Sequence, residues 1–213
     1  MARVMAPSPE AGSKPAQILE AAGRLFLENG YGAVSMDTVA KVANVSKATL
    51  YAHFRSKDEL FAAMVACECR GQMDTLSCDE IERMEVPDAL RMIGRRFLNL
   101  LLSGKALAAY RVVVAEAQRF PELARAFYES GPAHGHRQLA AYLRDVNRRN
   151  LLRIPDADLA AEQFYGLLKA HIHTRFILGI EDRMPDAEVE RLVNAAVDLF
   201  TKGYATSHDG AGT

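Results

Sequence analysis

The stretch from residue 35 to residue 61 constrains the fold of this chain more than any other. It reads SMDTVAKVANVSKATLYAHFRSKDELF, which fits two very short helices, a tight turn and a capped third helix. These elements are too small to enclose a hydrophobic core of their own. The arrangement is typical of a helix-turn-helix, which places one short helix in the major groove of DNA. The pattern therefore favours a protein that binds an operator and does no chemistry.

Residues that favour helix starts and turns mark the boundaries within this stretch. A serine hydroxyl at an N-cap accepts a hydrogen bond from the first turn, and asparagine tolerates the left-handed conformation that ends a helix. The sequence has N-caps at Ser35, Ser46 and Ser56, the last in a capping box with Glu59, and a turn residue at Asn44. The second helix is expected from Lys47 to about Phe54.

The middle helix is expected to have one buried and one exposed side. Leu50 and Phe54 are four residues apart, so they share a face and anchor the helix. Ala48, Tyr51 and Ala52 lie opposite, with Thr49 on one flank. Alanines allow close approach and contact with a thymine methyl, while Tyr and Thr supply hydroxyl groups. This side suits the reading of a DNA groove.

Basic side chains surround that exposed side. Lys47, His53, Arg55 and Lys57 form a rim with a charge of plus three when His is neutral, and no acid lies between Lys47 and Lys57. Such a rim suits phosphate contacts. Each residue also has a plainer interpretation: the charges as solvated side chains, Tyr51 as a partly buried packing residue, and His53 as a cap.

The N-terminal quarter of the chain closely resembles the DNA-binding domain of the TetR (tetracycline-repressor-like) regulators. The likeness runs over residues 15 to about 65 and rests on Ile18-Leu19-Glu20-Ala21-Ala22, Leu25-Phe26, Gly30-Tyr31, Ser35-Met36, Val39-Ala40, Val45-Ser46-Lys47, Leu50-Tyr51, His53-Phe54, Lys57 and Glu59-Leu60. The segment from Tyr110 to Ala117 with Phe120-Pro121-Glu122-Leu123 is similar to the ligand domain of the AefR-like branch.

The resemblance implies an all-helical homodimeric regulator, usually a repressor that a small molecule releases from its operator. It implies that Lys47, Ala48, Thr49, Tyr51 and Ala52 face bases or nearby backbone. It implies phosphate contacts by Ser35, His53 and Lys57. Ser46 completes the expected DNA-binding set. Ala52 departs from the family, since some relatives have a larger aromatic residue there.

Composition limits the class of protein. The chain has 213 residues, 49% of them hydrophobic, and a net charge of −1, so its basic surface is local. Three cysteines, Cys67, Cys69 and Cys78, favour a reducing compartment, with a redox pair as the alternative. The sequence has no apolar run of about 18 residues, and its first 15 residues lack a signal-peptide core. A cytoplasmic protein without a membrane contact is expected.

Helix signals continue to the end of the chain, which predicts an all-α fold of about nine helices. The expected divisions are a disordered arm (1–14), the helix-turn-helix domain (15–62), a ligand-binding and dimerisation domain (63–205) and a disordered tail (206–213). Two long helices are expected over 138–151 and 156–178, and a last one from Pro185 to about Lys202. The helix that ends near Leu178 is apolar on more than one side, and the final helix has a wide apolar stripe: Val189, Leu192, Val193, Ala196, Val197 and Phe200. Pairing of these two helices with those of a second copy favours a four-helix dimer interface; the alternative is burial within one subunit.

A small-molecule pocket is expected within the second domain, with an apolar or aromatic effector. Its candidate lining is Met64, Cys67, Phe97, Tyr110, Val114, Phe127, Phe164 and His171. The plainer interpretation of most of these residues is ordinary core.

Other chemistry lacks support in the sequence. His171 and His173 are two apart on an expected helix, about 200° around its axis, and His134 and His136 flank a glycine in an expected loop without matching ligands. There is no phosphate loop or nucleophile motif, so no metal, cofactor or enzymatic activity is expected. The alternative function is a helical small-molecule-binding or scaffold protein whose N-terminal helices contact protein rather than DNA.

Overall fold

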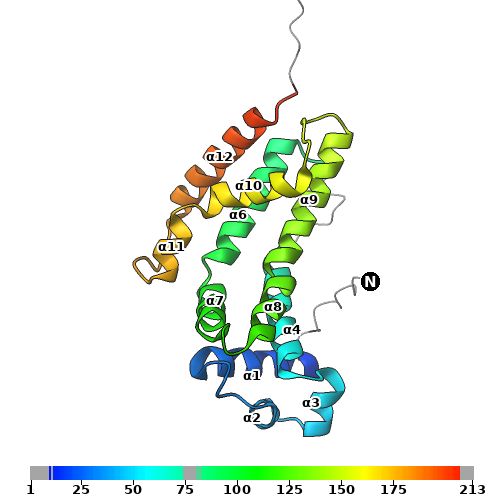
Figure 1. Cartoon of the computed structure of the whole chain (residues 1–213), viewed down its shortest axis with the longest axis vertical. Coiled ribbons are helices and arrows are strands. Elements are labelled where there is room, and N and C mark those ends of the chain that lie inside the picture. The colour runs from blue at the N-terminus through cyan, green and yellow to red at the C-terminus, as the bar shows by residue number, and fades with distance from the viewer. Residues whose placement is uncertain (1–9, 11, 74–80, 82, 207–213) are drawn as a thin grey trace, which may run out of the picture. The chain divides into compact units, whose positions relative to one another are not determined.

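The computed structural model describes residues 10, 12–73, 81 and 83–206, and within them the only regular elements are helices (Figure 1). This confirms the all-α prediction. Their bounds are α1 Lys14–Asn29, α2 Met36–Val42, α3 Lys47–His53, α4 Lys57–Met73, α6 Val86–Leu101, α7 Gly104–Glu116, α8 Pro121–Ser130, α9 Pro132–Arg148, α10 Ala157–Lys169, α11 Ile172–Ile177 and α12 Asp186–Gly203.

The expected caps determine where the first four helices begin and end. The hydroxyls of Ser35 and Ser46 accept hydrogen bonds from the backbone of α2 and α3, and Asn44 has the left-handed conformation, with φ of 51°. Before α4, Ser56 accepts from the Glu59 amide at 3.1 Å. The Glu59 carboxylate, however, accepts from the Arg55 amide, one residue before the cap expected to donate. Of the two hydrogen bonds of a capping box, the one from the Glu59 amide to the Ser56 hydroxyl is therefore formed. The other is shifted by one residue, because the Glu59 carboxylate accepts from Arg55 instead of Ser56.

The chain divides into two compact units. One contains the residues up to 71 and 105–132, and the other contains 72–104 and 133–213. Helices α7 and α8 therefore pack with α1 to α4, although they lie beyond residue 62, where the sequence suggests that the DNA-binding domain ends. The expected arm (1–9 and 11), the connection over 74–80 and 82, and the tail from 207 lie outside the described residues.

Four aromatic rings form the centre of the first unit. Phe26, Tyr31 and Phe61 pack against one another with ring centroids 5.4 to 5.8 Å apart, and Phe120 lies 5.3 Å from Tyr31. Tyr31 follows Gly30, which ends α1 at φ of 79°, a conformation that favours glycine. This core holds α2 and α3 through their buried faces, including Val39 and Leu50.

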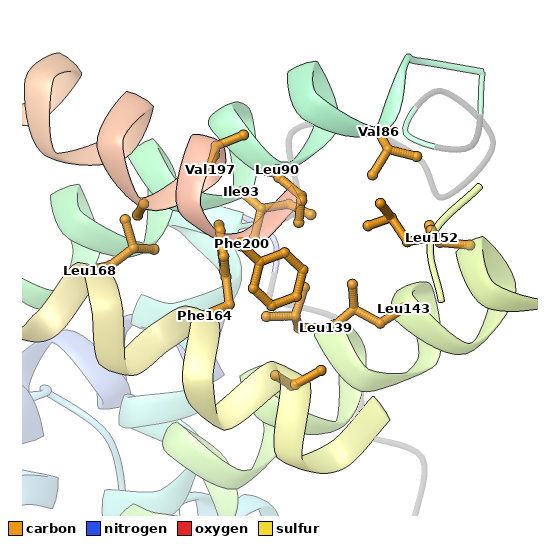
Figure 2. Close-up of a cluster of buried hydrophobic side chains, with 14 of the residues drawn as sticks. Val86, Leu90, Ile93, Leu139, Leu143, Leu152, Phe164, Leu168, Val197 and Phe200 are labelled. Carbon is orange, nitrogen blue, oxygen red and sulfur yellow. The ribbon is translucent and has the colours of Figure 1, made fainter. Parts of the chain in front are cut away.

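The second unit has a mainly aliphatic core contributed by α6, α9, α10 and α12. Figure 2 shows Leu90, Leu143, Leu168 and Val197 around Phe164 and Phe200. Helix α6 packs against both α10 and α12, and these two also pack on each other. The apolar residues Val189, Val193, Ala196, Val197 and Phe200 of α12 are buried within this single subunit.

Helix α9 differs from the expected 138–151, because it begins at Pro132 and ends at Arg148. Proline is favoured in the first turn of a helix, so Pro132 begins this helix as well as following the end of α8. Asn150 adopts the left-handed conformation with φ of 55°, as Asn44 does. His134 and His136 therefore lie on a helix, and the prediction that they flank a glycine in a loop is wrong.

The helix expected over 156–178 is interrupted, so the described residues hold more helices than the nine or so predicted. Helix α10 ends at Lys169 and α11 begins at Ile172, with Ala170 between them at φ of 28°. Alanine rarely adopts a positive φ, and no glycine or proline marks the break. His171 precedes α11 and is exposed, whereas His173 lies within it and is buried.

Candidate nucleic-acid interface

Helix α3 exposes the side expected to face DNA. Leu50 is fully buried and Phe54 is nearly so, whereas Tyr51 is 48% exposed. Ala48 and Ala52 are exposed beside it. Burial of the Leu50 and Phe54 side fixes the rotation of this short helix, and the small residues and the tyrosine hydroxyl consequently point outward.

The same local motif begins both short helices. Ser46 accepts from the Thr49 amide at 3.0 Å and its hydroxyl lies 2.8 Å from the Thr49 hydroxyl. Ser35 and Thr38 repeat this pair at the start of α2, at 3.1 and 2.8 Å. The two serine hydroxyls are thus already engaged in capping, which holds the first turn of each helix in place.

Lys47 and Arg55 belong to the exposed basic rim, and His53 is exposed with them. Lys47 forms an ion pair with Asp37 of α2, in which both side chains are more than half exposed. Sequence spacing does not predict this contact, because Asp37 is ten residues from Lys47 and lies outside the acid-free segment. The helix-turn-helix geometry brings the two side chains together.

Lys57 has a different environment from Lys47. Its ammonium group donates to the carbonyl oxygens of Tyr31 and Val34, both at 2.9 Å, and lies 4.2 Å from the centroid of the Tyr31 ring. Burial lowers the pKa of Lys57, although the charges of Asp58 and Glu116 oppose this shift. These contacts tie the start of α4 to the segment between α1 and α2.

Residues far along the chain complete this part of the first unit. The Gly32 amide donates to the Glu116 carboxylate at 3.3 Å, and the Phe120 ring packs on Tyr31. The Tyr31 hydroxyl donates to Asp58. Burial, reinforced by Asp58, raises the pKa of Tyr31, so the phenol keeps its proton. The end of α7 therefore contacts the segment that supports α2.

The expected effector residues are distributed over both compact units. Met64, Cys67, Tyr110, Val114 and Phe127 belong to the first unit, and Phe97, Phe164 and His171 belong to the second. Val114 is 60% exposed and Phe164 is fully buried. Tyr110 packs edge-on against Phe127 with centroids 6.1 Å apart. Cys67 and Cys69 are partly buried on α4, and Cys78 lies outside the described residues.

Two polar residues of the second unit, Tyr165 and His173, are not in the expected effector lining. Tyr165 stacks on Phe97 with centroids 4.2 Å apart, and its hydroxyl donates to the Gly135 carbonyl at 3.4 Å. His173 is 6% exposed, and burial, aided by the charge of Lys169, lowers its pKa to about 4. A neutral imidazole and a phenol are polar groups of the kind that orient a ligand in an otherwise apolar site.

Helix α3 is short, is anchored by the buried Leu50 and Phe54 and exposes its opposite side, and the chain has a second helical unit. This arrangement is typical of helix-turn-helix transcriptional regulators. Two family models match the chain. One describes bacterial regulatory proteins of the tetR family and covers residues 18–64. The other describes the C-terminal domain of the AefR-like transcriptional repressor and covers residues 88–206, more than half of the chain. The chain belongs to the TetR family of DNA-binding transcriptional regulators.

Relatives are similar over the whole length or over the N-terminal part alone. The flavonoid-responsive regulator FrrA is 37% identical, with 92% of this chain and 100% of that one covered and a TM-score of 0.75. A TetR-family regulator from Mesorhizobium loti is 28% identical, covering 93% and 100%, with a TM-score of 0.77. YvkB of Bacillus subtilis is 25% identical, covering 89% and 96%. YhgD of Bacillus subtilis is 57% identical over 44 residues, which cover 21% of this chain and 23% of YhgD.

No single helix among the described residues has the length and apolar character needed to cross a membrane. Helices α6 and α7 satisfy that test only when they are combined, on length and composition alone.

Proposed function

We propose that this regulator is a dimeric repressor that binds a two-fold-symmetric operator through α3 and is released by an aromatic small molecule. The outward side of α3 is the observation that carries the proposal. Ala48, Tyr51 and Ala52 are exposed on that side, and Thr49 flanks them. In a groove, these residues would meet bases while Lys47, His53 and Arg55 meet phosphates.

Among the expected phosphate contacts, the roles differ. The hydroxyls of Ser35 and Ser46 cap helices and are placed to position α2 and α3. Two backbone carbonyls hold the Lys57 ammonium, which supports a role in positioning α4 beside any contact with DNA. Lys47 and Arg55 are the better candidates for direct phosphate contacts, because their side chains are more exposed.

The second unit supports dimerisation through α10 and α12. A stripe of exposed small and aliphatic residues consists of Leu159, Gly166 and Leu167 on α10, Ala170 directly after its end, and Ala195 and Leu199 on α12. A side chain added at Gly166 would meet open space, so nothing within the subunit covers this stripe there. A second copy related by two-fold symmetry would bury both stripes against each other.

The proposed dimer suggests how an effector would release the operator. Half-sites on a duplex repeat at roughly 34–36 Å, so two α3 helices in one dimer must match that spacing. An effector that favours a dimer with a different spacing would weaken operator binding by a population shift. The effector needs to bind the two forms with different affinities, and it needs no contact with DNA.

An aromatic effector is supported by the likeness to FrrA and by residues of the second unit. FrrA is flavonoid-responsive and is 37% identical over its whole length. The stacked Phe97 and Tyr165 rings offer flat apolar surfaces, and the Tyr165 hydroxyl supplies a polar group beside them. A planar phenolic compound matches both features, since its rings can stack and its hydroxyls can form hydrogen bonds.

The main test has two parts. The protein is titrated against its own upstream DNA in rising salt, and DNA fragments captured by the pure protein are sequenced. We expect one enriched sequence with two-fold symmetry and a stoichiometry of two chains for each half-site pair. Fragments without a shared sequence, bound no better than unrelated DNA, would instead support the interpretation as a helical scaffold or binding protein.

The effector is tested by adding a flavone to the operator complex, with a fatty acyl-CoA as an apolar compound of another shape. We expect the flavone to release DNA and the acyl-CoA to leave it bound. Phe97→Leu should weaken the flavone response, whereas the matched Phe127→Leu in the first unit should not. A response lost only in Phe127→Leu would assign the effector to the first unit.

A further inference from the structure

We infer that Asp37 limits the affinity of this regulator for DNA by holding the Lys47 ammonium in the free protein. The inference rests on the proposed placement of α3 against a duplex. Lys47 Nζ lies 2.5 Å from Oδ2 of Asp37, and the two side chains are 65% and 57% exposed. A phosphate that approaches Lys47 therefore meets a carboxylate already bound there.

The position of Asp37 on α2 keeps its carboxylate close to the basic rim. It lies in the first turn of α2, directly after the Ser35 cap and Met36. Lys47 occupies the first position of α3, directly after the Ser46 cap, and the first turn of α3 has no acid of its own. Helices α2 and α3 pack on each other within one unit, which brings the two first turns together.

Exchange of the carboxylate for a phosphate reduces the gain from binding. When Lys47 turns to a phosphate, DNA releases a condensed cation, which is the main source of sequence-independent affinity. Asp37 is then left without its partner beside a polyanion and attracts a cation in its place. Part of the release is cancelled, so the salt dependence of binding is shallower than the number of basic residues on the rim suggests.

The effect should be the same for any DNA sequence, because neither Asp37 nor Lys47 needs to read a base for it. Asp37 thus sets the absolute affinity and leaves discrimination to the outward side of α3. A moderate absolute affinity keeps the operator complex within the range in which a small effector can dissociate it.

The test measures binding of the full-length dimer to its operator and to unrelated DNA over a range of salt concentrations. Asp37→Asn should raise both affinities by about two- to fivefold at low salt, since exposed ion pairs of this kind contribute up to about a factor of five. It should steepen the slope of log K against log salt by up to about 1 and leave the ratio of the two affinities unchanged.

Three variants separate this role from simpler explanations. Asp37→Glu retains the charge and should bind like the unaltered protein. Glu122→Gln removes another exposed carboxylate of the same unit, which pairs with Arg125 on α8, and should change little. In the Lys47→Ala background, Asp37→Asn should have almost no effect, because there is no ammonium group to release. Thermal melting shows whether any variant has lost its fold, and Asp37→Ser then replaces Asp37→Asn.

Several results would overturn the inference. Lower affinity of a folded Asp37→Asn protein would mean that the acid holds Lys47 in place for DNA. If Asp37→Asn raised the affinity equally with and without Lys47, general repulsion between Asp37 and DNA would explain the gain. If Asp37→Asn left the slope of log K against log salt unchanged, Asp37 would have no part in cation release. If the unaltered protein shows no salt-dependent DNA binding, the proposed operator function is wrong. If the unaltered protein binds DNA and Asp37→Asn does not change that binding, only the role of Asp37 is wrong.

Discussion

Two surfaces of this regulator expose large apolar side chains to the same degree but differ in everything around them. Tyr51 on α3 and Leu159 on α10 are each 48% exposed. Tyr51 has a hydroxyl group, with alanines beside it and basic side chains at the rim. Leu159 belongs to a stripe with Leu167, Leu199 and small residues. The degree of exposure alone therefore says little about the partner.

The chemistry around each side chain distinguishes the two partners. DNA interfaces are polar, wet and positively charged on the protein side, so an amphipathic ring within a basic rim fits them. Interfaces between identical subunits are more apolar, which fits leucines and small residues on paired helices. Substitutions on one surface should accordingly change properties that substitutions on the other surface leave intact.

The largest effect is expected from Leu199→Glu on the α10–α12 stripe. In the proposed dimer Leu199 is buried against the partner subunit, and a buried unpaired charge costs about 3–5 kcal/mol. Sedimentation should show monomers at concentrations at which the unaltered protein is dimeric, with operator affinity reduced together with dimerisation. Tyr128→Glu on α8 is the control, since Tyr128 is 58% exposed and Leu199 is 60% exposed. Equal dissociation of both variants would argue against the stripe.

The next effect concerns the buried side of α3. Leu50→Ala should lower the free energy of unfolding by about 2–5 kcal/mol, because Leu50 is fully buried and truncation leaves a cavity. Denaturant titration of the full chain measures this loss. Val42→Ala on the neighbouring α2 provides the comparison, since Val42 is 41% exposed and should cost less than about 0.5 kcal/mol. Similar losses for both would mean that α3 is not anchored through Leu50.

The sequence predicts the end of a helix only where a residue there favours the conformation that ends it. Asn44 and Asn150 both adopt the left-handed conformation, and both are asparagine, yet only Asn44 lay in a recognised motif and was assigned a turn. The end of α9 was thus predictable by the same reasoning. Ala170 is different, because an alanine gives no sign of the positive φ that separates α10 from α11. The residues at the break between α10 and α11 therefore carry no local signal for it.

The candidate interface shows the same division. Caps and periodicity predicted the side of α3 that is exposed, since both depend on residues within four positions of one another. The partners of the two lysines were not predictable in this way. Asp37 is ten residues from Lys47, and the carbonyls of Tyr31 and Val34 are 26 and 23 residues from Lys57. Such contacts depend on how the helices pack.

A smaller effect is expected from removal of the Tyr51 side chain. If Tyr51 contacts a base, Tyr51→Ala should cost about 1–3 kcal/mol of operator affinity and relax preference at one position of each half-site. Tyr51→Phe retains the ring and separates stacking from hydrogen bonding through the hydroxyl. Dimerisation and thermal stability should be unchanged, because the side chain is half exposed. Operator affinity and sequence preference equal to those of the unaltered protein would exclude Tyr51 from base recognition.

The smallest effect on DNA binding is expected at the two lysines of the rim, and it separates their roles. Lys47→Ala should reduce the slope of log K against log salt by up to about 1, and by less with Asp37 present than in the Asp37→Asn background, with no change in stability. Lys57→Met keeps the aliphatic stem but removes the ammonium group from two carbonyl oxygens, so it should lower stability by about 1–3 kcal/mol. Its slope should change less than that of Lys47→Ala. A stable Lys57→Met protein whose slope of log K against log salt is shallower than that of Lys47→Ala would show that Lys57, and not Lys47, contacts a phosphate.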